Sequence, residues 1–92
     1  MSQSLAVANG FDVAMAAVTD LIRTVSEKAR TRMIAADTLL LEDLALDSLD
    51  VVRIVMLIED RHGVSIDLDV VADMKSVADL ANALVQEARS AA

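Results

Sequence analysis

The chain has no cysteine, proline, tryptophan or tyrosine, one phenylalanine (Phe11) and one histidine (His62). Without cysteine it can form neither a disulfide nor a thiolate metal site. A single histidine is too few for a His-based zinc site, so we expect no metal ligands. Aromatic and β-branched residues favour strands, whereas a chain rich in Ala, Leu and Met favours helices. These absences predict an all-α fold.

Cations are scarce as well, because eight Lys and Arg accompany fifteen Asp and Glu, a formal net charge of −7. Nucleic acids and anionic membrane surfaces both attract basic segments, so neither is expected as a partner. No uncharged apolar run approaches the length of a membrane span, so membrane insertion is not expected either. The N-terminus lacks the basic and apolar regions of a secretory signal. We expect a cytoplasmic monomer whose partners carry basic docking surfaces.

Ninety-two residues make one domain with one modest core. We expect a flexible leader over residues 1–10, the folded domain over residues 11–89 and a loose C-terminus over residues 90–92. Apolar residues recur at steps of three and four from Phe11 to Ala29, which predicts the first helix. Basic residues suit a helix end, and the expected end of this helix carries Lys28, Arg30 and Arg32.

A long loop is expected over residues 31–47, and part of it fills the core. A short extra helix over residues 39–45 is the alternative. The other helices are expected from Asp47 or Ser48 to about Arg61, from Leu68 to about Asp73, and after a cap formed by Ser76 with Asp79. The prediction is a four-helix bundle of three main helices, with a short third helix and a long first loop.

The apolar stripes separate the expected core from the expected surface. The expected core residues are Leu21, Val25, Ile54, Val55, Ile58, Leu80 and Leu84. Leu49 and Met56 are expected to be partly exposed, and a flexible Met suits a surface that meets several partners. Val52 is either core or partner surface, because a wide stripe on a small bundle can be fully buried.

Residues 44–50, Leu-Ala-Leu-Asp-Ser-Leu-Asp, place Ser48 where a polar loop ends and a helix begins. A helix start exposes unpaired N–H groups and a partial positive charge, which suits an anion. Ser48 has no neighbouring histidine that would activate it as a nucleophile. The pattern therefore indicates a serine that is modified by another protein, and we expect no catalytic residue in this chain.

These seven residues, preceded by Glu42-Asp43, resemble the phosphopantetheine attachment motif of acyl carrier proteins. The resemblance extends over residues 11–88 and includes Val55–Asp60, Val64–Asp67 and Met74–Val77. It implies that Ser48 carries 4'-phosphopantetheine, transferred from coenzyme A by a Mg2+-dependent phosphopantetheinyl transferase. The arm would hold acyl intermediates as thioesters and present them to the acyl-loading and acyl-processing enzymes of a fatty-acid, polyketide or specialised lipid pathway.

The resemblance also implies two sets of site residues. Asp47 and Leu49 flank Ser48 at the cofactor site, and Asp47 serves as a helix cap, as a partner contact, or as both. The residues expected to meet partner enzymes are Asp43, Asp50, Val52, Arg53, Met56, Glu59 and Asp60. A solvated helix face is the alternative for the acids among them.

Ala45 and Arg53 are the departures from the family pattern on which the choice of carrier type depends. Ala45 stands where the family usually has glycine, which costs about 1 kcal/mol if the position has a positive φ. Arg53 stands where fatty-acid carriers usually have an acid, and Arg61 further dilutes the acidic strip. We expect a specialised stand-alone carrier. An aminoacyl or peptidyl carrier is the alternative, and a helical interaction module without the arm is another.

Overall fold

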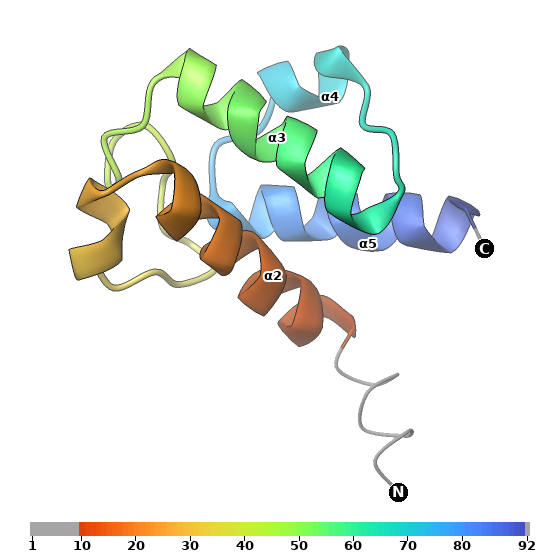
Figure 1. The fold of residues 1–92 in the computed structure, drawn as a ribbon, viewed down its shortest axis with the longest axis horizontal. Helices are drawn as coiled ribbons and strands as arrows, with labels where there is room; N and C mark the ends of the chain where they lie inside the picture. The colour runs from red at the N-terminus through yellow and green to blue at the C-terminus, as the bar shows by residue number, and fades with distance from the viewer. Residues whose placement is uncertain (1–9, 92) are drawn as a thin grey trace, which may run out of the picture.

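The computed structural model describes residues 10–91 (Figure 1). Its elements, in chain order, are α2 (Gly10–Val25), the 3-10 helix η1 (Lys28–Thr31), α3 (Ser48–His62), α4 (Leu68–Ala72) and α5 (Val77–Ala91). All of these elements are helical, so the predicted all-α class is confirmed. The predicted leader lies outside the described residues apart from Gly10, which begins α2.

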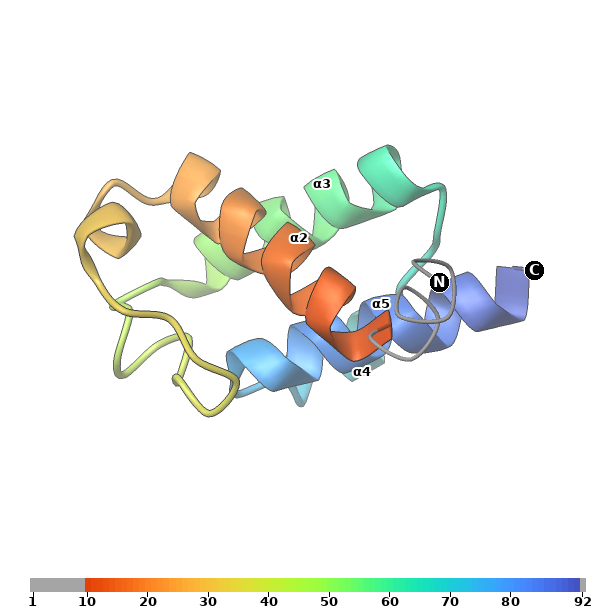
Figure 2. The ribbon, with the colours of Figure 1, turned by 90° about the horizontal axis from the view of Figure 1, so that it is seen from below.

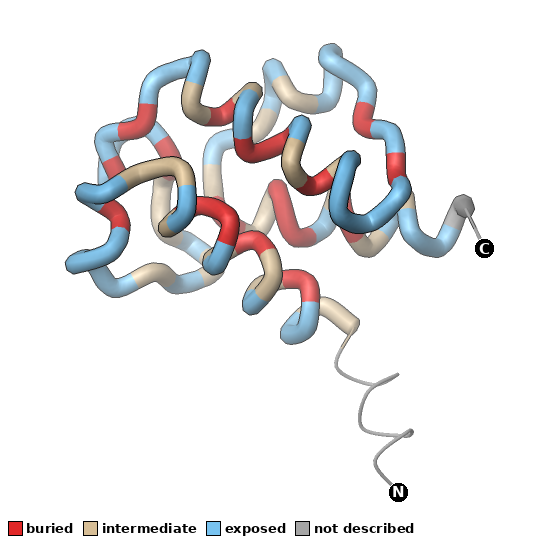
Figure 3. Tube along the Cα trace, in the orientation of Figure 1, coloured by how far each residue is buried: buried red, intermediate tan, exposed pale blue. Residues whose placement is uncertain are grey.

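Helix α2 packs against both α5 and α3, and α3 also contacts α5. The short α4 lies on the other side of the α3–α5 pair from α2 (Figures 1 and 2). Buried residues line the facing sides of the three long helices (Figure 3). The largest fully buried side chains are Ile22, Leu40, Leu44, Ile54, Ile58, Leu80, Val18 and Val77. The predicted core is confirmed except at Val25, which is half-buried at the end of α2.

The first helix ends earlier than predicted, at Val25 instead of near Ala29. The chain turns there, and the hydroxyl of Ser26 accepts a hydrogen bond from the N–H of Ala29 at 3.3 Å. Serine side chains compete in this way with continued helical bonding. Ala29 is nevertheless fully buried, on η1, which explains why the apolar spacing continues past the helix end.

The long loop after η1 fills part of the core, as predicted. Leu40, Leu44 and Leu46 are buried, while Leu41 between them is 52% exposed. Residues 40–44 form hydrogen-bonded turns instead of the alternative short helix. The loop is joined to the start of α5 by hydrogen bonds from the N–H of Leu40 to the oxygen of Lys75 at 2.8 Å and from the N–H of Val77 to the oxygen of Thr38 at 2.9 Å.

The helix ends after the loop follow signals in the sequence. Gly63 ends α3 with φ +64°, a left-handed conformation that glycine adopts without strain. Asp67 caps α4 by accepting from the N–H of Asp69 at 3.1 Å. Ser76 and Asp79 form the predicted reciprocal cap of α5, with bonds of 3.3 and 3.0 Å. Helix α5 continues to Ala91, beyond the predicted domain boundary at residue 89.

The molecule is elongated, with principal extents of 38, 27 and 19 Å. The start of α3 lies near one end of the long axis, together with η1 and the long loop (Figure 1). The start of α2 and the end of α5 both lie toward the other end (Figures 1 and 2).

Candidate functional site

Ser48 is the first residue of α3, and its side chain is exposed. The adjacent residue Asp47 is the N-cap, with extended backbone angles of φ −98° and ψ 176°. The first N–H groups of α3 have no acceptor within the helix, and the helix dipole adds partial positive charge at this end. The hydroxyl of Ser48 therefore lies where an attached phosphate would be stabilised.

A reciprocal capping box holds this helix start in place. The Oδ1 atom of Asp47 accepts from the N–H of Asp50 at 2.8 Å, and the Oδ2 atom of Asp50 accepts from the N–H of Asp47 at 3.3 Å. The capping function considered for Asp47 is therefore present in the structure. Because the two acids bracket Ser48 within one turn, they fix its backbone without engaging its hydroxyl.

The loop before Ser48 is anchored by two buried side chains and contains one strained residue. Leu44 and Leu46 are 1% and 4% exposed. Ala45 between them has a φ of +56°, in the left-handed region that disfavours residues with a Cβ. The sequence predicts a cost for Ala45 if its φ is positive, and its φ is positive. The loop adopts this backbone despite the alanine because the two leucines enter the core on either side.

An apolar groove of about 400 Å3 opens beside Ser48. Val51 and Val52 of α3 line one side, Leu68, Val71 and Ala72 of α4 line another, and Leu40, Leu41 and Met74 complete it. We call this the serine groove. Among the described residues that line it, Ser48 has the only polar side chain.

The serine groove was not anticipated from the sequence, although Val52 was among the expected site residues. Leu68 is 70% exposed at the start of α4, in a segment where acids alternate with apolar residues. The available signal for the groove was a leucine in a very short helix. No residue of that helix is buried, so the leucine remains exposed. The groove itself depends on how α4 is placed against α3, which local sequence does not specify.

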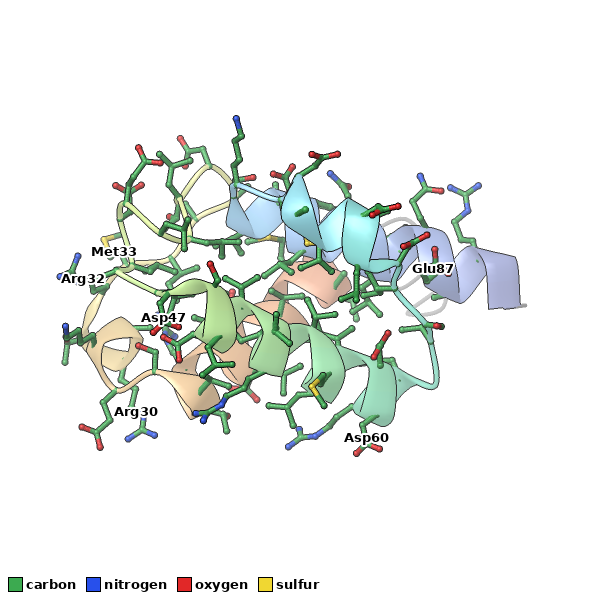
Figure 4. The ribbon with its side chains drawn as sticks, turned by 90° about the horizontal axis from the view of Figure 1, so that it is seen from above. Arg30, Arg32, Met33, Asp47, Asp60 and Glu87 are labelled. Atoms are coloured by element: carbon green, nitrogen blue, oxygen red, sulfur yellow. The ribbon has the colours of Figure 1, made fainter. Side chains whose placement is uncertain are left out.

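The acids expected on the partner surface are mostly engaged with the backbone. Asp43 accepts from the N–H of Leu39 at 2.9 Å, and Asp50 belongs to the capping box. Glu59 is half-buried, and its Oε2 atom accepts from the N–H of Ile66 at 2.8 Å. These bonds leave the carboxylate charges in place but fix where they lie. Asp47 and Asp60 are exposed at opposite ends of α3 (Figure 4).

The apolar residues of the expected partner surface divide between two places. Leu49 and Met56 are 61% and 60% exposed, as predicted, and Val52 is half-buried. Val52 lines the serine groove, whereas Met56 and Arg53 line a second groove together with Thr24, Val25 and Leu57. Val52 and Met56 are one turn apart on α3 and border different grooves.

The described residues around Ser48 provide no group to activate its hydroxyl. His62 is at the other end of the 15-residue helix α3, roughly 20 Å away along its axis. Within residues 10–91 no cluster of three His, Asp or Glu side chains is placed to hold a metal ion. What the arrangement offers is an exposed hydroxyl on a rigid helix start, beside an apolar groove. Another protein can transfer a group to this hydroxyl, and the apolar groove can then contact the attached group.

None of the helices over the described residues combines the length and apolar character needed to cross a bilayer.

Comparison with known proteins identifies a family for this arrangement. The family profile described as "Phosphopantetheine attachment site" matches residues 11–84, which include α2, the long loop, Ser48 and most of α5. No curated protein and no solved structure matches the chain. The four α-helices within residues 10–91, the exposed serine at the start of α3 and this match agree with one another.

Proposed function

This chain belongs to the phosphopantetheine attachment site family, and from that premise we propose that it carries acyl intermediates on an arm joined to the Oγ atom of Ser48. Members of the family are carriers of 4'-phosphopantetheine. When bound, the arm supplies a terminal thiol that holds the cargo as a thioester. The match covers 74 residues, counted from 11 to 84, and fits the exposed Ser48 at the helix start.

The single observation that favours an acyl cargo is the serine groove. Its lining is aliphatic except for Ser48, at a volume of about 400 Å3. Each methylene group buried from water contributes about 0.8 kcal/mol, so an aliphatic chain gains from entering it. The ammonium group of an aminoacyl cargo would lose its hydration there without a partner. A fatty-acid, polyketide or specialised lipid pathway therefore fits better than an aminoacyl or peptidyl one.

Arg53 is the observation that favours the second candidate, an aminoacyl or peptidyl carrier. By the resemblance, it stands where fatty-acid carriers usually have an acid, and it makes the exposed side of α3 less uniformly acidic. The serine groove weighs against it, since peptide cargo needs no apolar cover.

The partners we propose are a phosphopantetheinyl transferase and enzymes with basic docking surfaces. Asp47 and Asp60 present exposed carboxylates on α3, and Leu49 adds an exposed apolar contact next to Ser48. Opposite charges guide approach and orientation more than they add affinity. The chain itself contributes no catalytic group in this proposal, and the base that deprotonates Ser48 belongs to the transferase.

Attachment is tested by incubating the chain with coenzyme A, Mg2+ and a broad-specificity transferase, followed by intact mass measurement. We expect one phosphopantetheinyl group on the wild type and none on Ser48→Ala. Ser65→Ala is the matched control, because Ser65 is also exposed but lies outside any helix start. Modification that persists in Ser48→Ala, or that is absent from the folded wild type with several transferases, contradicts the proposal.

The cargo is tested by comparing octanoyl-loaded and glycyl-loaded protein by NMR. We expect the backbone amides of Val52, Leu68 and Val71 to shift with octanoyl and not with glycyl, relative to the unloaded arm. Equal shifts with both cargoes would remove the argument for an acyl pathway and leave attachment at Ser48 untouched.

A further inference from the structure

We propose that the groove between the end of α2 and the exposed side of α3 binds an acidic segment of a partner protein that also presents an apolar side chain. Thr24, Val25, Arg53, Met56 and Leu57 line this groove, which has a volume of about 390 Å3 and which we call the lateral groove. The proposal goes beyond carriage of the arm and does not depend on it. It concerns a region of the described chain in which basic residues are concentrated, although the protein as a whole is acidic.

The basic residues of this chain are unevenly distributed. Four of the eight fall within residues 23–32, with Glu27 as the only acid there, although the whole chain has a net charge of −7. Lys28, Arg30 and Arg32 are exposed on or beside η1, which directly follows α2. Four cations and one acid give this segment a formal net charge of +3 within a chain of −7.

Hydrogen bonds attach this basic turn to the end of α2, beside the lateral groove. The Nε atom of Arg30 donates to the oxygen of Arg23 at 2.8 Å, and the Nη2 atom of Arg23 donates to the oxygen of Arg32 at 3.1 Å. Arg23 directly precedes Thr24, which lines the groove. These acceptors are carbonyl oxygens, which carry no net charge, so the guanidinium groups are oriented without being neutralised.

Arg53 brings a further cation to the groove from α3. Its side chain is exposed, and among residues 10–91 it takes part in no side-chain hydrogen bond. The nearest acid one turn earlier, Asp50, has its carboxylate in the capping box with Asp47. A guanidinium presents a planar set of donors that matches a carboxylate, and here that set is available to a partner.

Met56 gives the groove an apolar anchor point. It lies one turn after Arg53 on α3, is 60% exposed, and lines the groove with the partly buried Val25 and Leu57. Interfaces commonly combine an apolar anchor with charged contacts at its edge. The occupant that fits is therefore a segment with one apolar side chain flanked by carboxylates.

Along the side of the molecule that carries the basic turn, the charge of the side chains changes from one end to the other. Figure 4 places Arg30 at one end of this side and Asp60 at the other. Carboxylates of a partner at the lateral groove are attracted toward Arg30 and repelled by Asp60, which favours one orientation, although the exposed Arg61 beside Asp60 weakens this preference. A lipid surface fits poorly, since an anionic bilayer repels the chain as a whole at a net charge of −7.

The test uses the unmodified full chain and a synthetic peptide in which glutamates flank one leucine. We record amide NMR shifts during titration at low ionic strength, and the control peptide has glutamine in place of each glutamate. We expect shifts from the acidic peptide confined to residues 23–33 and 53–57, and none from the control. Shifts elsewhere, no shifts, or equal shifts with both peptides overturn the proposal.

Variants separate the groove from general electrostatic attraction. Arg53→Glu is expected to weaken peptide binding at least about fivefold, and Arg53→Lys by no more than about threefold. Arg89→Glu, the same charge change on the last turn of α5, is the matched control and should leave affinity within about twofold. Equal loss in Arg53→Glu and Arg89→Glu overturns the proposal, as does binding to phosphatidylserine vesicles in the absence of binding to the peptide. Because no step uses the arm, these results are independent of modification at Ser48.

Discussion

Ala45 has a backbone conformation that its side chain disfavours. Its φ of +56° lies in the left-handed region, where a Cβ costs roughly 1 kcal/mol. Ala45→Gly removes the clash, and we expect the free energy of unfolding to rise by about 0.5–1 kcal/mol, measured by urea denaturation. Ala35→Gly is the matched control, because Ala35 is an exposed loop alanine with negative φ, and it should lower stability. If the free energy of unfolding of Ala45→Gly is no higher than that of the wild type, the backbone at Ala45 is not strained.

Asp79 has a pKa held below its ordinary value of 3.8. The causes are hydrogen bonds to its carboxylate from the N–H of Lys75 at 2.7 Å and from the N–H of Ser76 at 3.0 Å. A carboxyl group whose pKa is lower in the folded state contributes stability above the unfolded pKa. That contribution is lost as the pH falls below about 3.8 and through the folded value.

We therefore expect Asp79→Asn to be less stable than the wild type at neutral pH, and the difference to shrink as the pH falls below about 3.8. Urea unfolding at a series of pH values measures both chains. Asp73→Asn, an exposed acid at the end of α4 for which no such bond to its carboxylate is present among the described residues, is the control. A difference between Asp79→Asn and wild type that stays constant with pH would rule out this linkage.

At the scale of elements, the capping box shows how α3 positions Ser48 by local means. Asp47→Ala removes the acceptor of the Asp50 N–H bond and is expected to cost about 1 kcal/mol of stability. Asp47→Asn keeps a capping oxygen and removes the charge, so its stability should stay within a few tenths of a kcal/mol of the wild type. Urea denaturation gives both values, and the rate of modification at Ser48 is measured in parallel.

The two variants separate the functions considered for Asp47. If its charge also attracts the transferase, modification slows in both variants while stability falls in the alanine variant alone. An asparagine variant as unstable as the alanine variant would mean that the cap is not what Asp47 contributes.

The sequence predicts the bounds of α3, α4 and α5 to within a residue or two. Asp47 and Gly63 mark the ends of α3, and Ser76 with Asp79 marks the start of α5. The sequence does not predict the end of α2. Ala29 continues the apolar spacing, and only the bond from Ala29 to Ser26 reveals that the helix has given way to η1.

The candidate site shows the same division between local and tertiary signals. The exposure of Ser48, Leu49 and Met56 follows from their positions on α3. The hydrogen bond from the N–H of Ile66 to Glu59 spans the turn after α3, and no spacing of residues in the sequence predicts it. The two grooves depend on how α4 and α2 are placed against α3, so neither was predicted.

At the scale of the whole molecule, the long loop supplies part of the core. Leu44→Ala is expected to lower the free energy of unfolding by roughly 2–5 kcal/mol, because it leaves a cavity in the hydrophobic core. Leu41→Ala, three residues earlier and 52% exposed, should cost within about 0.5 kcal/mol. Thermal and urea unfolding of the pair measure this contrast, and similar losses in both variants would mean that the loop does not enter the core as described.

The placement of the start of α2 and the end of α5 has a consequence for motion. The start of α2 and the end of α5 lie toward one end of a molecule 38 Å long, and α3 begins near the other. If the start of α2 or the end of α5 is tethered, the molecule rotates about that point, and Ser48 lies far from it. A modest rotation of the whole body then moves the serine a long way, without any change inside the bundle.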